Sequence, residues 1–375
     1  MYEPNFTLTA NLSDSLKEIE DIRSLLQEIR VLPIVEEHIQ RQALVETVYY
    51  TARIEGNPLD IRVAKRLRSR QPSKADIDRN EQDYVNLYKV MDFVRYIAGQ
   101  RDTPIDEEVI KQIHAFVVRD IPDQGSPGVY KTKPNAIIDQ TAKEHIFLPP
   151  SPSDTPRLMS ELSNWLSRKP LAFHPIITAG LAHLELVAIH PFDNGNGRTA
   201  RALADLILYR YGYALRYLFS WVKHVGIDMG TYHRKLREVL GPQYGANVDP
   251  TIWLEYFAES VVNSLLEKKP YLIRMRDTLV DAYNFGNERG LSSDQVEAIV
   301  YAALNGYVTT GVYMGATVLS RATVVKRLNH LVEAGIMKVI GKGRGVRYVL
   351  VPTEALMSEE QRAEGVQLKL EMDEG

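Results

Sequence analysis

One short stretch of the sequence combines residue types that bind phosphate and move a proton. Residues 190–201 read HPFDNGNGRTAR, with His190 first, a Gly-Asn-Gly turn at 195–197, and Arg198 and Arg201 at the end. Histidine exchanges a proton near neutral pH. Arginine binds phosphate oxygens through forked N–H donors, and glycine lets backbone N–H groups approach an anion closely. The stretch therefore predicts a general base beside a polyphosphate cradle.

The flanking residues predict two helices that hold this stretch in place. Residues 175–189 are mostly apolar, as in a buried helix, and Pro175 suits its first turn. Pro191 disfavours helical dihedrals at His190, so the helix should break there and free the imidazole to point into a cleft. Apolar residues at helical spacing predict a second helix over 198–211. The glycines then lie at a helix N-terminus, which favours an anion.

The stretch resembles the signature of the Fic family, which reads H-P-F-x-[D/E]-G-N-G-R-x-x-R. The matching residues are His190, Pro191, Phe192, Gly195, Asn196, Gly197, Arg198 and Arg201. The likeness extends over about residues 35–265. Members of this family mostly transfer AMP from ATP to a protein hydroxyl, with Mg²⁺. The resemblance implies a mainly α fold, in which a Fic-type helical bundle carries a β-hairpin flap.

The resemblance also implies a role for each matching side chain. His190 would be the general base that takes the proton from the target hydroxyl, and Phe192 would fix the loop. The segment 195–197 would hold the α- and β-phosphates of ATP. Arg198 would bind the β-phosphate and Arg201 the γ-phosphate. The resemblance therefore implies ATP as the substrate of this site.

Two positions in the motif bear on the reaction type and on the metal. A family branch that resembles a kinase has lysine where this chain has Gly197, so glycine favours AMP transfer. The family's metal-binding acid is replaced by Asn194. An amide oxygen can bind Mg²⁺ but adds no negative charge, whereas Mg²⁺ is usually held by one or two carboxylates and phosphates. We expect Asn194 to be a weaker metal ligand.

A second stretch, TARIEGNP at residues 51–58, predicts a helix end that carries a carboxylate. Thr51 and Glu55 are four apart and share a helix face. From spacing alone, Glu55 is more often an exposed acid at a frayed end. The stretch is similar, however, to the Fic inhibitory helix, [S/T]-x-x-x-E-[G/N]. That resemblance implies that Glu55 pairs with Arg201 where the γ-phosphate would sit, and that Glu55 could also position water for removal of AMP.

The remaining sequence predicts the elements around these two stretches. Helices are expected over residues 12–30, 38–55, 79–97 and 106–119, and again from about 155 to about 270. Residues 135–148 predict a hairpin, which resembles the flap that binds a target protein segment by strand addition. Tyr232 or His233 would stack on the adenine, and Trp253 is expected in the core.

The chain should divide into several parts. We expect an N-terminal helical region at 1–110, a Fic catalytic domain at 111–270, a winged-helix domain at 285–352 and an acidic tail at 353–375. The winged helix offers basic residues to DNA phosphates, although such domains also bind proteins. These residues are Arg321, Lys326, Arg327, Lys342, Arg344 and Arg347. Family relatives often form homodimers, and a dimer could control Glu55.

Composition excludes several other classes of function. The 375 residues carry a net charge of −3 and are 45% hydrophobic and 25% charged, which is typical of a soluble globular protein. The absence of cysteine excludes disulfides, thiol catalysis and cysteine-bound zinc. No apolar run is long enough to span a membrane, so a cytoplasmic location is expected. Two alternatives remain: a DNA-binding regulator whose Fic-like part senses nucleotide, and transfer of a different phosphoryl group.

Overall fold

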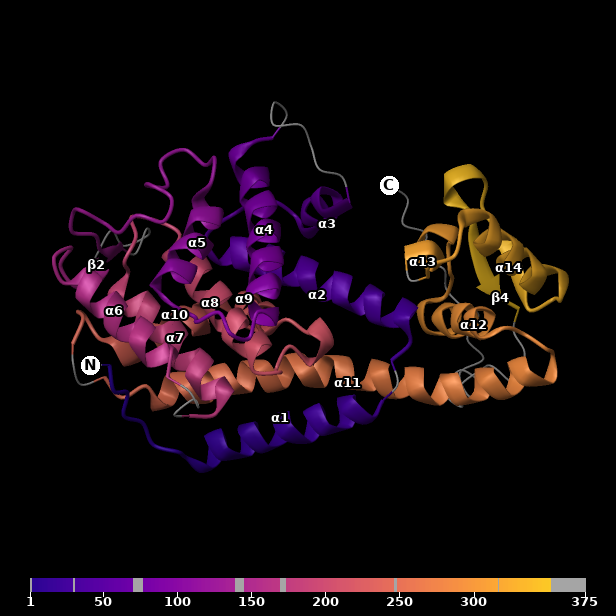
Figure 1. The fold of residues 1–375 in the computed structure, drawn as a ribbon, viewed down its shortest axis with the longest axis horizontal. Helices are drawn as coiled ribbons and strands as arrows, with labels where there is room; N and C mark the ends of the chain where they lie inside the picture. Colours follow the sequence, from indigo (N-terminus) through magenta and orange to yellow (C-terminus); the bar gives the residue numbers. More distant parts are fainter. Residues whose placement is uncertain are drawn as a thin grey trace. The chain divides into compact units, whose positions relative to one another are not determined.

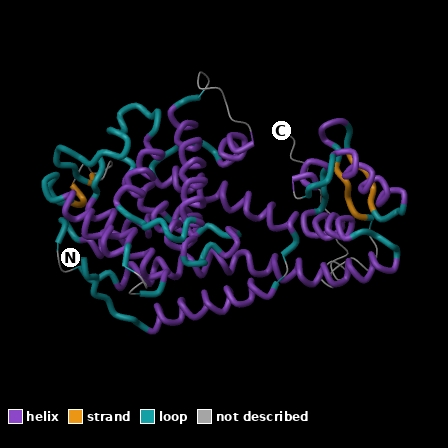
Figure 2. Tube along the Cα trace, in the orientation of Figure 1, coloured by secondary structure: helices purple, strands orange, loops and turns teal. Residues whose placement is uncertain are grey.

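The computed structural model describes residues 2–29, 31–69, 77–138, 145–168, 173–245, 248–315 and 317–351. Helices make up most of this part of the chain, and the strands are confined to two short hairpins (Figure 2). The prediction of a mainly α protein is therefore confirmed. The chain forms two compact units. The first combines residues 1–24 with 42–266, and the second combines residues 25–41 with the chain from residue 267 onward.

The helices that precede the flap follow the predicted order, with one addition. They are α1 (Ala10–Glu28), α2 (Pro33–Ile54), α3 (Ile61–Ser69), α4 (Arg79–Gly99) and α5 (Glu107–Val118) (Figure 1). The short helix α3 was not expected from the sequence. Asp106 caps the N-terminus of α5, because its carboxylate accepts a hydrogen bond from the Val109 N–H at 2.9 Å.

The predicted hairpin is present beside these helices. Strand β1 (Ile137–Ile138) pairs antiparallel with β2 (His145–Phe147), and Ile137 lies opposite Phe147. Residues 139–144, which the sequence places at the hairpin tip, lie outside the described residues. Just after β2, the Leu148 N–H donates to Pro242 O and its carbonyl accepts from the Tyr244 N–H, each at 2.9 Å. This side of the hairpin is therefore already paired with residues 242–244.

Three helices then build the centre of the first unit. They are α6 (Thr155–Leu166), α7 (Pro175–Ile189) and α8 (Asn196–Arg210). Nearly every residue of α7 is buried, including the polar His183, and α8 packs against α4, α5 and α7. Burial of one large aliphatic side chain contributes about 1.5–3 kcal/mol. The helices on both sides of the 190–195 loop are therefore fixed in the core.

The helices after α8 extend further than the sequence predicted. They are α9 (Trp221–Ile227), α10 (Met229–Leu240) and α11 (Thr251–Glu288), with a short 3-10 turn at Leu215–Tyr217. The prediction that this helical region ends near residue 270 was wrong, because α11 continues through Pro270. Proline removes one backbone donor. The apolar face nonetheless continues beyond it, where Leu272 and Met275 are buried.

The last described elements belong to the second unit. They are α12 (Ser293–Asn305), α13 (Thr310–Gly315), α14 (Arg321–Glu333), β3 (Met337–Ile340) and β4 (Arg347–Leu350). The strands β3 and β4 are antiparallel. Ser320 caps α14 by accepting from the Thr323 N–H at 3.2 Å. Among the described residues, no helix is both long and apolar enough to cross a membrane.

Candidate active site

His190 ends α7 in a left-handed conformation. Its φ and ψ are 48° and 56°, and its N–H donates to Leu186 O at 3.0 Å. The predicted helix break at this residue is therefore confirmed. The imidazole Nδ1 lies 3.2 Å from Val187 O. A carbonyl oxygen only accepts, so Nδ1 carries the proton and Nε2 keeps a free lone pair. Burial lowers the pKa of His190 to about 4, so the ring is neutral at pH 7 and can accept a proton.

The loop after His190 is held by side chains on both of its faces. Asn196 accepts from the Phe192 N–H at 2.9 Å and donates to Phe192 O at 2.8 Å. His114 of α5 stacks on the Phe192 ring, with centroids 3.7 Å apart. The His114 Nδ1 accepts from the Gly128 N–H, and its Nε2–H donates to Asn194 O, each at 3.0 Å. The Asn196 side chain therefore braces the loop, which leaves its backbone N–H for a phosphate.

Both glycines of the turn meet close neighbours. Gly195 has φ of +75°, a conformation that strains residues with a side chain, and a Cβ there would lie 3.0 Å from Val117 and Val118. A Cβ at Gly197 would collide with the Glu55 carboxylate. The first glycine is thus required by the turn. Gly197, which has no side chain, leaves room for the carboxylate of Glu55, the residue that follows α2.

Glu55 lies against Arg201. The Arg201 Nη2 donates to Glu55 Oε1 at 2.7 Å and to Thr51 O at 3.1 Å. Arg201 is 1% exposed and Glu55 is 30% exposed at their side chains. Burial by itself would raise the pKa of Glu55, but the charges of Arg201 and Arg198 outweigh it, and the net pKa is lowered. The structure brings this predicted pair together, while the inhibitory role of Glu55 remains a prediction.

A cavity of about 700 Å³ collects most of the predicted site residues. His190, Gly197, Arg201, Glu55 and Tyr232 line it, together with residues of the flap and of α10. Its volume is in the range of sites for small ligands. Residues of the motif, of the end of α2 and of the flap therefore line the same cavity.

The wall that α10 contributes bears on one prediction. The Tyr232 hydroxyl lies 3.0 Å from His183 Nε2 and accepts from Arg201 at 3.4 Å, and the residue is 2% exposed. Little of the Tyr232 ring is left to stack on a base. The neighbouring His233 is exposed and also lines the cavity. His233 is therefore the more accessible of the two side chains, and the identity of the adenine contact stays a prediction. Trp253 is fully buried, as predicted.

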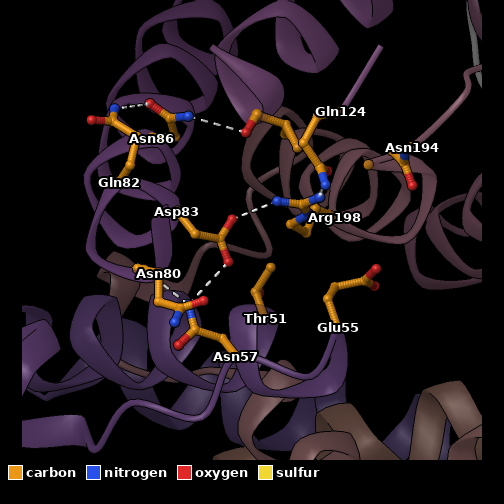
Figure 3. A network of polar contacts seen from close by, with 12 residues as sticks. Thr51, Glu55, Asn57, Asn80, Gln82, Asp83, Asn86, Gln124, Asn194 and Arg198 are labelled. Carbon is orange, nitrogen blue, oxygen red and sulfur yellow. Dashed lines mark hydrogen bonds and ion pairs between the residues drawn. The ribbon is translucent and has the colours of Figure 1, made fainter. Parts of the chain in front are cut away.

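Arg198 points away from this cavity. Its guanidinium donates to Asp83 of α4 and, at 2.6 Å, to Gln124 (Figure 3). Asp83 also accepts from Asn57 Nδ2 at 3.3 Å, two residues after Glu55. Although Arg198 and Arg201 are neighbours on α8, they have different partners, and Arg198 does not line the cavity. The expected contact of Arg198 with a β-phosphate would need this guanidinium to turn away from Asp83. The sequence carried no signal for Asp83.

The Asp83–Arg198 pair should be important for stability. Their side chains are 10% and 7% exposed. Removing one member of a buried ion pair leaves an unpaired charge and costs about 3–5 kcal/mol. We expect Asp83→Ala to lower the free energy of unfolding by about that amount, measured by urea denaturation. Asp92→Ala, at an exposed position of the same helix, should change it by less than about 0.5 kcal/mol. Equal effects of the two variants would contradict this role.

The predicted metal ligand lies at the surface of the loop. Asn194 is exposed, and its Nδ2 donates to Asp123 O at 3.1 Å. The Asp193 side chain lies against Gly125. Within the described part of the chain, no group of three or more His, Asp or Glu side chains is placed to hold a metal. One neutral amide does not match the carboxylates that normally hold Mg²⁺. These residues do not form a magnesium site by themselves.

Comparison with solved structures defines the fold class. A Fic family protein from Desulfovibrio desulfuricans G20 matches over 94% of this chain and 99% of its own, with a TM-score of 0.62 and 22% identity. Fic-1 (aa134 - 508) from C. elegans matches over 69% and 72%, with a TM-score of 0.55 and 22% identity. The predicted Fic-type fold is therefore confirmed.

Comparison of sequences then identifies a domain. The model of the Fic/DOC family matches residues 104–208, which include the motif and α8. Residues 104–208 of this chain therefore carry a Fic domain. Two relatives named protein adenylyltransferase Fic are from Nematostella vectensis, 29% identical over 204 residues, and Drosophila sechellia, 32% identical over 178 residues. These matches cover 53% and 46% of this chain, and 45% and 34% of the relatives. The chain thus spans less than half of their length.

Proposed function

We propose that this protein is an autoinhibited protein adenylyltransferase, a nucleotidyltransferase that moves AMP from ATP to a Ser, Thr or Tyr hydroxyl. The main supporting observation is the single cavity in which neutral His190 faces the same space as Gly197 and Arg201. A proton acceptor beside phosphate-binding groups is what this reaction needs. The name of the curated relatives supports the same activity.

The proposed reaction is a single displacement at the α-phosphorus. The target hydroxyl gives its proton to His190 Nε2 as its oxygen bonds to the α-phosphorus. The bond to the oxygen that bridges the α- and β-phosphates breaks, and pyrophosphate leaves with that oxygen. Arg201 would hold the γ-phosphate, and the N–H groups at the start of α8 would hold the α- and β-phosphates. The Glu55 carboxylate already accepts a hydrogen bond from the Arg201 guanidinium, which the γ-phosphate would need. This contact is the basis of the proposed inhibition.

Mg²⁺ enters this proposal only as the ion that accompanies ATP, with Asn194 as the side chain to test as its ligand. We expect Asn194→Asp to lower the Mg²⁺ concentration for half-maximal transfer by roughly tenfold, which is about 1.4 kcal/mol, because it adds a negative charge. A magnesium titration of the transfer rate measures this. Asp193→Asn, whose side chain lies against Gly125, should change it little. An unchanged requirement in Asn194→Asp would remove this residue from the metal site.

The pH dependence of transfer should reflect the environment of His190. A base must be unprotonated to act, and burial lowers the pKa of His190 from 6.5 to about 4. The value of kcat/KM should therefore be flat between about pH 5.5 and 8 and fall only at lower pH. In Glu55→Gly the fall should come at still lower pH, because the charge of Glu55 raises the pKa of His190. A decline centred near pH 6.5 would show that the imidazole is not buried during turnover.

The target protein would dock on the flap. Leu148 already pairs with the chain around Gln243 on one side of the hairpin. No pairing is present on the outer edge of β1 within the described residues, so that edge is the one to which a target strand would add. The flap residues Ile137 and Phe147 also line the cavity, so a hydroxyl in the added strand would lie near His190. Glu55 could also orient a water that removes AMP, which release of labelled AMP from modified protein would test.

Labelled nucleotide separates the alternatives. Label from α-labelled ATP should appear on protein, whereas γ-labelled ATP should leave it unlabelled. Transfer of γ-label would indicate a kinase. Nucleotide binding without transfer of either label would favour the DNA-binding regulator. This experiment needs no knowledge of the target if a cell lysate supplies the acceptor proteins.

We propose a winged helix for residues 285–352, as a module that binds a partner. Two of its expected DNA contacts have internal partners: Arg327 pairs with Asp294 at 3.4 Å, and Arg347 lies over the Tyr307 ring. The side chain of Arg344 lies outside the described residues. Arg321, Lys326 and Lys342 are exposed and remain the candidate phosphate contacts. Loss of a gel shift at moderate salt would mark any DNA binding as nonspecific.

A further inference from the structure

A segment before the flap binds the carbonyl groups of four successive residues around His190. Lys131 Nζ donates to Ile189 O at 3.2 Å, and the Lys131 backbone N–H donates to Pro191 O at 2.8 Å. Asn135 Nδ2 donates to His190 O at 3.2 Å and to Phe192 O at 3.1 Å. The carbonyls of residues 189–192 are therefore all satisfied from two positions. Lys131 Nζ also donates to Asn135 Oδ1 at 2.8 Å, which joins the two side chains.

These contacts meet at a strained point of the backbone. His190 has a positive φ of 48°, and a residue with a side chain held in that region costs about 1–3 kcal/mol. Such a conformation persists only where surrounding contacts impose it. The C-terminus of α7 also carries partial negative charge, which an ammonium group stabilises. Lys131 is 3% exposed, so its charge acts on α7 with little screening by water.

We propose that Lys131 and Asn135 are positioning residues that hold His190 in its left-handed conformation and aim its Nε2 into the cavity. This inference rests on the proposed role of His190 as a base. Neither side chain lines the cavity, so both act through the loop backbone. They also couple the flap to the base, because Asn135 lies two residues before β1. A target strand added to β1 would bind beside the segment that positions His190.

The charge of Lys131 gives this proposal a readout that does not need turnover. Besides burial, the positive charge of Lys131 lowers the pKa of His190, while the charge of Glu55 raises it. Burial also lowers the pKa of Lys131 itself to about 8, against the nearby charge of Asp193. At pH 7 most of the lysine is still protonated. Removing this charge should raise the pKa of His190, and a purely structural role in packing would not.

The test compares four variants of the full chain: Lys131→Met, Lys131→Arg, Asn135→Ala, and the control Lys133→Met at an exposed position of the same segment. The pKa of His190 is measured by NMR with labelled histidine, and its resonance is assigned with His190→Gln. Transfer from α-labelled ATP gives kcat and the KM for ATP. Thermal melting reports whether each variant is folded.

We expect Lys131→Met to raise the pKa of His190 and to lower kcat roughly 10²-fold, the effect of a displaced catalytic group. The KM for ATP should change less than about threefold. Asn135→Ala should lower kcat without the rise in pKa. Lys131→Arg should restore both values, and Lys133→Met should match the wild type. If Lys131→Met does not fold, Asn135→Ala and Lys131→Arg decide.

Different results would contradict the positioning role of Lys131 and Asn135 and the proposed transfer of AMP. An unchanged pKa of His190 in folded Lys131→Met, or equal losses in kcat for Lys131→Met and Lys133→Met, would overturn the positioning role. A wild-type kcat in folded Asn135→Ala would do the same. Absence of transfer even in Glu55→Gly, together with the expected rise in the pKa of His190 in Lys131→Met, would instead overturn the function and leave the role of Lys131 supported.

Discussion

Replacing Glu55 by glycine is expected to raise AMP transfer about 5- to 150-fold, the usual range of a coupling free energy of 1–3 kcal/mol. The carboxylate accepts from Arg201 at 2.7 Å inside the cavity. A γ-phosphate must replace it to reach the same guanidinium. Without Glu55, the triphosphate can settle with its α-phosphate in line with the target hydroxyl. The initial rate of labelling from α-labelled ATP measures the change.

Two further variants distinguish the effect of the Glu55 charge from the effect of loosening the end of α2. Glu55→Gln keeps most of the volume and removes the charge, so it should activate less than glycine. Arg53→Gly lies in the same last turn of α2 but is exposed, and it should leave the rate near that of the wild type. If Arg53→Gly activates as much as Glu55→Gly, fraying of α2 would explain the activation, and the Glu55–Arg201 pair would not.

Replacing His190 by alanine is expected to lower transfer about 10²- to 10⁴-fold, the usual contribution of a general base. The effect is best measured in the Glu55→Gly background, where the wild-type motif is active. Removing the imidazole takes away the proton acceptor but leaves Gly197 and Arg201 in place, so ATP should still bind. Calorimetry should therefore give a similar affinity for ATP with and without His190.

A histidine away from the cavity provides the control. His224 lies in α9 near Asn263 and does not line the cavity, so His224→Ala should leave transfer nearly unchanged. A His190→Ala variant that binds ATP and transfers AMP at an undiminished rate would show that another group, or water, accepts the proton. Loss of both binding and transfer would point to a collapsed loop.

Local signals in the sequence predicted the elements around the motif. Pro175 and Pro191 define the ends of α7, and the positive φ of Gly195 marks the start of α8. These effects act within a few residues, so the helix break at His190 could be found from sequence alone. The pairing of Glu55 with Arg201 was suggested only by the family resemblance, because spacing alone favoured an exposed acid.

Contacts between distant positions could not be predicted in this way. Asp83 lies 115 residues before Arg198, and only the packing of α4 on α8 brings them together. Lys131 precedes the motif in a proline- and glycine-rich segment without helical or strand periodicity. The continuation of α11 beyond residue 270, through Pro270, was not predicted, and it is accompanied by side chains that are buried further along the helix.

The central claim is that one cavity transfers AMP and that Glu55 restrains it. Mass spectrometry of proteins incubated with ATP tests it most directly, comparing the wild type, Glu55→Gly and the double variant Glu55→Gly/His190→Ala in the same lysate. We predict adenylyl groups on Ser, Thr or Tyr side chains that are most abundant with Glu55→Gly and absent with the double variant. Phosphate in place of AMP, or equal labelling by Glu55→Gly and the double variant, would contradict the claim.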